Sequence, residues 1–79
     1  MSTDPTLRAL QRIQALQDRG SDPIKGTLQR INATTNPDKL LGIVEAALEM
    51  AKTAASKVLR QQWENVVTTA RGKYRKLAA

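Results

Sequence analysis

The sequence predicts an all-α fold, in which two short N-terminal helices pack on a long C-terminal helix. Three helix-start signals, each a capping residue followed by proline, divide the chain into segments. Apolar residues recur within these segments at helical spacing. The last segment, from Pro37 to Ala79, contains no further proline and consists mostly of tolerable or good helix formers. We expect a single helical domain over residues 1–79, with helices at about 5–19, 23–34 and 37–77.

The first helix is expected over residues 5–19. Asp4 is a favourable N-cap, and Pro5 suits the first helical position, where its missing N–H costs nothing. Gly20 supplies a C-terminal stop. Four apolar residues fall on one side of this helix at 100° per residue. They are Leu7, Leu10, Ile13 and Leu16.

The second helix, over residues 23–34, begins with the same kind of signal at Asp22 and Pro23. Gly26 weakens its interior by up to about 1 kcal/mol relative to alanine. Its apolar stripe is narrow and consists of Ile24, Leu28 and Ile31. Such a short helix is marginal alone, so it needs packing partners.

The first two helices resemble each other in sequence. Seven of the twelve positions in residues 4–15 are identical to those in residues 22–33. One interpretation is that the same helix-start pattern was used three times, since the third segment begins alike. The alternative is a duplicated docking surface, in which Arg12 and Arg30 are placed alike.

The third segment has two apolar faces, which point roughly 120° apart at 100° per residue. We expect one continuous helix over residues 37–77, because no Gly or Pro lies at the change of face and alanine favours continuation. The alternative is a break near Thr53–Ser56, which gives a four-helix bundle. The first face comprises Leu40, Ile43, Val44, Ala47, Leu48, Met50, Ala51, Ala54 and Ala55, and the second begins at Leu59.

Composition excludes several kinds of site. The 79 residues include no Cys and no His, so no disulfide is expected, nor Zn or most other transition metals. A chain this small buries only about 60% of its unfolded surface, which favours self-association as a source of stability. No apolar run follows Met1 or approaches a membrane span. We therefore expect a cytoplasmic, intracellular protein with no membrane partner and no cofactor.

Catalysis is not expected either. The chain offers no His, no Cys and no glycine-rich phosphate loop. Of its seven acidic residues, Asp4, Asp22 and Asp38 lie at helix starts, where capping and the helix dipole explain them. We expect a non-enzymatic protein without a small-molecule substrate.

The leading hypothesis is an interaction or assembly module. Two short helices are too short to cover a helix over residues 37–77, so the end of its second apolar face should lack a partner within the chain. An uncovered apolar stripe usually marks an interaction site, so we expect a homo-oligomer or a protein partner here. The predicted interface residues are Leu59, Trp63, Val66, Val67, Ala70, Tyr74 and Leu77.

The alternative hypothesis is a nucleic-acid-binding accessory protein. The formal net charge is +6, and residues 50–79 carry seven basic residues against Glu64 alone. Such a strip suits phosphates or an acidic partner. Basic residues near a helix C-terminus also complement the helix dipole without any ligand. The predicted contact residues are Lys57, Arg60, Arg71, Lys73, Arg75 and Lys76.

Overall fold

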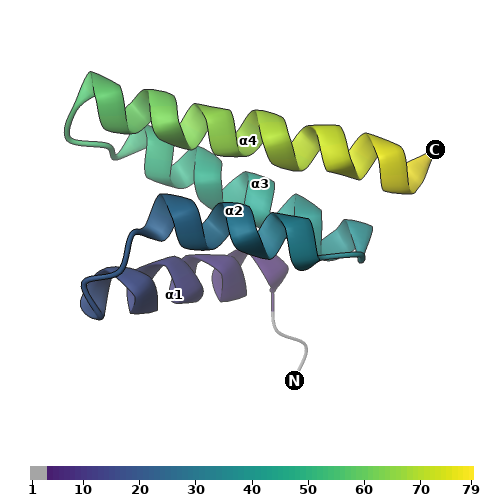
Figure 1. The fold of residues 1–79 in the computed structure, drawn as a ribbon, viewed down its shortest axis with the longest axis horizontal. Coiled ribbons are helices and arrows are strands. Elements are labelled where there is room, and N and C mark those ends of the chain that lie inside the picture. Colours follow the sequence, from purple (N-terminus) through teal and green to yellow (C-terminus); the bar gives the residue numbers. More distant parts are fainter. Residues whose placement is uncertain (1–3) are drawn as a thin grey trace.

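The structure, a computed structural model, describes residues 4–79. Every regular element in this range is a helix, which confirms the all-α prediction. The four helices are shown in Figure 1: α1 (Pro5–Asp18), α2 (Pro23–Ala33), α3 (Pro37–Lys52) and α4 (Lys57–Ala78). The first two helices each end one residue earlier than predicted.

The three predicted helix starts are confirmed. The Asp4 carboxylate accepts a hydrogen bond from the backbone N–H of Thr6 at 2.9 Å. The Asn36 side chain accepts one from the backbone N–H of Asp38 at 2.9 Å, and Asp22 caps α2 in the same way. Each cap gives a partner to an N–H group that the first helical turn leaves unsatisfied.

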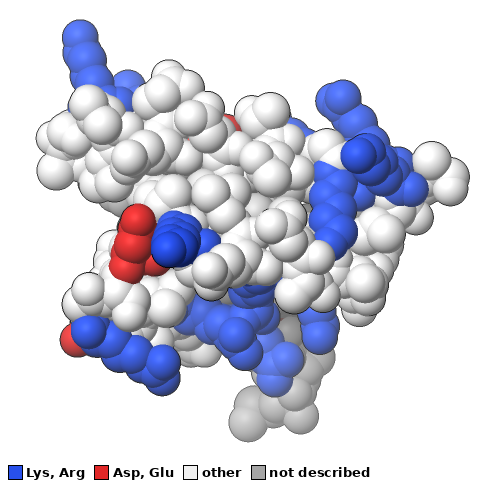
Figure 2. Space-filling model, in the orientation of Figure 1, with Lys and Arg blue, Asp and Glu red and all other residues white. Residues whose placement is uncertain are grey.

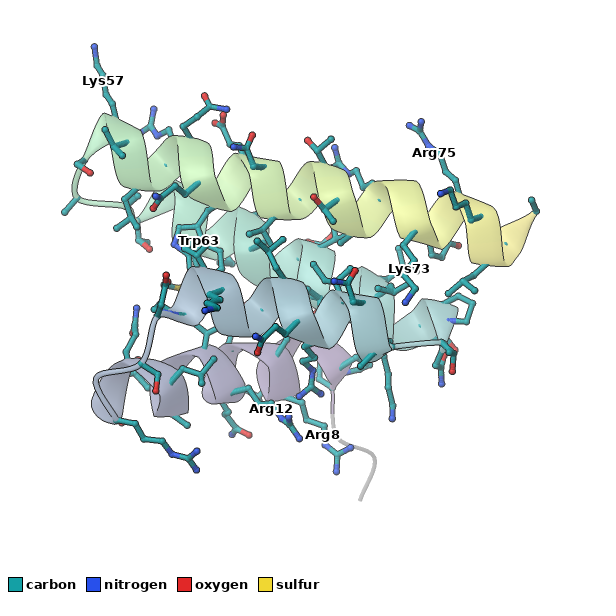
Figure 3. The ribbon with its side chains drawn as sticks, in the orientation of Figure 1. Arg8, Arg12, Lys57, Trp63, Lys73 and Arg75 are labelled. Atoms are coloured by element: carbon teal, nitrogen blue, oxygen red, sulfur yellow. The ribbon has the colours of Figure 1, made fainter. Side chains whose placement is uncertain are left out.

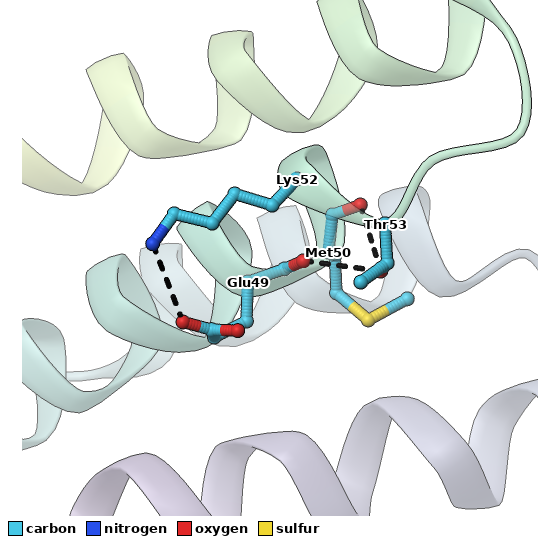
Figure 4. A network of polar contacts seen from close by, with 4 residues as sticks. All are labelled: Glu49, Met50, Lys52 and Thr53. Atoms are coloured by element: carbon cyan, nitrogen blue, oxygen red, sulfur yellow. Dashed lines mark hydrogen bonds and ion pairs between the residues drawn. The ribbon is translucent and has the colours of Figure 1, made fainter.

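The continuous helix expected over residues 37–77 is wrong, because the chain breaks at Thr53–Ser56, as the alternative proposed. The Thr53 hydroxyl group donates to the carbonyl oxygens of Glu49 and Met50, at 3.1 and 3.4 Å (Figure 4). These carbonyl groups belong to the last turn of α3, which a helix end otherwise leaves short of partners. The Thr53 side chain therefore stabilises the end of α3.

The next helix, α4, starts with a cap of its own. The Ser56 hydroxyl group accepts a hydrogen bond from the backbone N–H of Leu59 at 3.1 Å, and Ser56 has an extended backbone. The break thus needs neither Gly nor Pro. Polar caps on both sides outweigh the helix propensity of Ala54 and Ala55, which is a weak preference.

The break brings both apolar faces of the C-terminal half into one core. As Figure 1 shows, α4 turns back and runs antiparallel to α3. The central helix is α3, which packs on α4 and on α1, while α2 lies against α4 and α1. The largest fully buried side chains are Trp63, Ile31, Leu40 and Val66. The turn therefore accounts for the offset between the two faces.

The start of α1 lies very close to α3 at Gly42. A Cβ atom at position 42 would lie 2.7 Å from both the carbonyl carbon and the Cβ of Pro5. Only glycine lets the two backbones approach this closely. Because Arg8 and Arg12 follow Pro5 by about one and two helical turns, this contact also fixes where their side chains emerge.

Candidate anion-binding site

The apolar residues predicted as a partner interface do not form a free surface. Four are buried within the chain, two are half-buried against the same core, and one is exposed. The buried residues are Trp63, Val66, Val67 and Ala70, the half-buried residues are Leu59 and Tyr74, and the exposed residue is Leu77. The prediction of an exposed face here is wrong, because it assumed a continuous helix, whereas α4 folds back along α3. Association through another surface stays a prediction.

Five of the six basic residues predicted on α4 are exposed, and the sixth, Lys73, has partners within the chain. Lys73 is half-buried, and its ammonium group donates to the carbonyl oxygens of Ile31 and Asn32, at 2.8 and 2.7 Å. It therefore stabilises the C-terminal end of α2. In Figure 3, Lys57 and Arg75 project from the upper edge of the molecule. The exposed members are Lys57, Arg60, Arg71, Arg75 and Lys76.

A different set of cations converges at the opposite edge of the molecule. Arg8 and Arg12 lie one turn apart on α1, and Arg30 reaches the same place from α2. Together with Gln11 and Ala15, these three side chains line a hollow of about 370 Å³. Figure 2 shows blue atoms gathered along this lower edge, with a red one at its left end, and Figure 3 labels Arg8 and Arg12 there. We call Arg8, Arg12 and Arg30 the arginine cluster.

The internal repeat explains why Arg12 and Arg30 meet. The residues that follow them, Ile13 and Ile31, are both buried, so α1 and α2 turn equivalent sides towards the core. The two helices pack against each other and run in opposite directions (Figure 1). Equivalent arginines on both helices therefore border the groove between them.

The charge of Arg30 is disfavoured by its surroundings. Partial burial lowers the pKa of Arg30, and the positive charges of Arg12 and Arg8 lower it further. Within residues 4–79 no carboxylate pairs with the arginine cluster. The ion pair that these residues do form lies on α3 and joins Lys52 to Glu49 at 3.6 Å (Figure 4). A bound anion would offset both the desolvation and the repulsion.

A second cavity, of about 500 Å³, adjoins the hollow of the arginine cluster. The two share Arg12, Ala15 and Arg30 as lining residues. We call this second space the apolar cavity, because apolar atoms form most of its wall. The remaining lining residues are Ala9, Ile13, Leu16, Arg19, Gly26, Thr27, Gln29 and Ile43.

The arrangement suits phosphate groups. A guanidinium group is planar, stays charged in proteins, and forms two parallel hydrogen bonds to phosphate oxygens. Apart from arginines, the hollow is lined by Gln11 and Ala15, which provide neither a nucleophile nor a general base. The hollow therefore offers the positive charge and the hydrogen-bond donors that an anion requires.

Sequence reasoning located the candidate cations on a different helix. Arg8 is absent from the predicted site residues, and Arg12 and Arg30 enter only through the internal repeat. Charge counted along the chain favours α4, whereas the folded chain brings cations together from α1 and α2. The repeat was the one signal in the sequence that linked two members of the cluster.

Comparisons with protein-family models, curated proteins and solved structures find no match to this chain. None of the helices in residues 4–79 has both the length and the apolar character needed to cross a membrane. Over the same residues, no group of acidic side chains is placed to hold a metal ion. A functional proposal must therefore rest on the geometry and charge of the site.

Proposed function

We propose that the protein is a non-enzymatic nucleic-acid-binding module that contacts the phosphate backbone through Arg8, Arg12 and Arg30. The observation behind this proposal is the convergence of three guanidinium groups in a hollow that no carboxylate of residues 4–79 lines. Three like charges so placed repel one another, and the attraction of each to a bound phosphate group offsets that repulsion. Arginine is also the residue best suited to bidentate phosphate contacts.

The charge of the whole chain supports a polyanionic ligand rather than a single small anion. The formal net charge of +6 attracts a nucleic acid from a distance and raises the rate of encounter. The exposed cations of α4 contribute to this long-range attraction. They are separate from the arginine cluster, because no residue of α4 lines its hollow.

Two charge-matched triple variants test the proposal. Arg8→Gln/Arg12→Gln/Arg30→Gln removes the arginine cluster, and Lys57→Gln/Arg60→Gln/Arg75→Gln removes three cations of α4. Each lowers the formal net charge from +6 to +3, since three of 13 basic residues are lost. Glutamine is a good helix former, so both chains should fold. Binding to a labelled single strand of about 16 nucleotides is measured by fluorescence anisotropy in about 50 mM salt.

We expect the cluster variant to lose about tenfold or more in affinity, equivalent to at least about 1.4 kcal/mol, and the α4 variant to lose much less. Equal losses would mean that binding depends on net charge and not on this site. Absence of binding by the wild type at low salt would reject a nucleic-acid ligand altogether. Circular dichroism of each variant confirms that the helices are retained.

A further inference from the structure

The apolar cavity lies between α1, α2 and α3, beside the arginine cluster. Its volume of about 500 Å³ is within the range typical of small-ligand sites. Aliphatic side chains of Ile13, Leu16 and Ile43 form part of its wall. Gly26 faces Leu16 across the cavity wall, since a Cβ at position 26 would lie 2.7 Å from the Leu16 Cδ1. A flat apolar group would make van der Waals contacts with this wall.

Polar groups border the same cavity. Guanidinium planes stack on nucleic-acid bases and donate to base edges, and a glutamine amide both donates and accepts. The Thr27 hydroxyl group already donates to the carbonyl oxygen of Pro23 at 2.6 Å, so it needs no ligand. Among the residues that the structure describes, 4–79, no carboxylate lines the cavity or the neighbouring hollow. The side chains that remain for a ligand are Arg12, Arg19, Gln29 and Arg30.

We infer that the site takes an unpaired nucleotide, with its phosphate on the arginine cluster and its base in the apolar cavity. The two spaces share Arg12 and Arg30. A nucleotide whose base lies in the apolar cavity therefore has its phosphate beside the hollow of the arginine cluster. A duplex keeps its bases stacked and paired, and presents mainly phosphates to such a site. The protein therefore prefers single-stranded nucleic acid. This inference rests on the proposed function and specifies the form of nucleic acid that is bound.

The wild-type protein provides the first test. Three labelled oligonucleotides of equal length are compared by anisotropy: a single strand, the same strand with abasic sites at alternate positions, and a duplex. We expect the intact single strand to bind at least about fivefold more tightly than either of the others, the lower end of the effect known for base stacking. This comparison needs no substitution, so folding does not affect it.

A pair of variants then tests the apolar cavity itself. Ala15→Leu narrows both the cavity and the adjoining hollow from α1, because Ala15 lines both, whereas Ala33→Leu changes the equivalent residue of the internal repeat, which lines neither space. Both alanines are exposed, both substitutions preserve the charge, and leucine is a good helix former. We expect Ala15→Leu to reduce single-strand affinity at least to that of the abasic strand, and Ala33→Leu to leave it unchanged.

Three results would overturn the inference. If the abasic strand or the duplex binds as tightly as the intact strand, while loss of the arginine cluster still weakens binding, no unpaired base enters the apolar cavity and the proposed function stands. If no oligonucleotide binds at low salt, both proposals fail. If an acidic peptide with apolar residues binds more tightly than any oligonucleotide and Ala15→Leu abolishes that binding, the cavity serves a protein partner.

Discussion

The ammonium group of Lys73 on α4 donates to the carbonyl oxygen of Ile31 on α2 at 2.8 Å, and to that of Asn32 at 2.7 Å. These carbonyl groups lie near the C-terminal end of α2, where a positive charge is favoured by the helix dipole. Residue 31 directly follows Arg30. This contact between helices far apart in the sequence therefore also helps to hold the arginine cluster in place.

Loss of the Lys73 contact should destabilise the fold. Lys73→Met keeps the aliphatic chain but removes both hydrogen bonds, which should lower the free energy of unfolding by about 1.5–3 kcal/mol. Lys76→Met, at an exposed position three residues later, serves as the control and should change it by less than about 0.5 kcal/mol. Urea denaturation followed by circular dichroism measures both. Equal effects would show that the Lys73 contact contributes nothing beyond its charge.

Two glycine-to-alanine substitutions should act in opposite directions. Gly42→Ala forces a methyl group against the backbone of Pro5 and should lower the free energy of unfolding by about 1–3 kcal/mol. Gly72→Ala meets no atom within 4 Å on the exposed side of α4, and should raise it by up to about 1 kcal/mol. Thermal unfolding measures both changes. A stable Gly42→Ala protein would contradict the close approach of α1 to α3.

The position of Trp63 predicts how the protein behaves on dilution. Trp63 is 1% exposed within a single chain, so its fluorescence should be that of a buried indole and should not depend on protein concentration. Trp63→Ala should cost about 3–5 kcal/mol, a large part of the stability of a small domain. Sedimentation velocity and emission spectra of the wild type over a dilution series test whether Trp63 stays buried within a single chain. A red shift of the emission on dilution would instead place Trp63 at an interface between subunits.

Replacement of Arg30 should separate binding from stability. Its lowered pKa means that the charged side chain is less favourable in the folded chain than in the unfolded one. Arg30→Met keeps much of the aliphatic contact and removes the charge, so the free energy of unfolding should stay the same or rise. The affinity for a single strand should fall. Denaturation and anisotropy on the same sample measure both, and a variant that is less stable but binds normally would contradict a role in the ligand site.

The same pKa shift predicts how stability depends on pH. Where the folded pKa of a base lies below its unfolded value, the unfolded state binds more protons between the two values, and stability rises with pH in that window. For Arg30 this window lies in strongly alkaline solution, because arginine keeps its proton throughout the physiological range. With no His in the chain, binding should therefore be nearly constant around neutral pH. Anisotropy at several pH values and fixed salt measures this, and a titration near neutrality would contradict it.

Helix starts were predictable from the sequence because capping is local. Asp4 and Asp22 each need only the next few residues to form their hydrogen bonds, and the helix follows. The break before α4 is also capped locally, by Thr53 and Ser56. It competes with the helix propensity of the alanines between them, so local sequence does not decide the outcome.

The candidate site was less predictable because it depends on packing between helices. The offset between the two apolar faces was a correct signal of a change in direction, but it is equally consistent with a straight helix that has two partners. Trp63, which was predicted on an exposed face, therefore lies in the core. The meeting of Arg8 with Arg30 depends on how α1 and α2 lie against each other, and charge density along the chain contains no such information.

The salt dependence of binding tests the central claim most directly. Each phosphate neutralised on a single strand contributes about −0.7 to the slope of log K against log salt concentration. The wild type and the two charge-matched triple variants are titrated from about 50 mM to about 200 mM salt. Removal of Arg8, Arg12 and Arg30 should reduce the magnitude of this slope by about 0.7 for each phosphate that the arginine cluster neutralises, whereas removal of Lys57, Arg60 and Arg75 should leave it nearly unchanged. Equal changes in slope for the two variants would contradict a phosphate site at the arginine cluster.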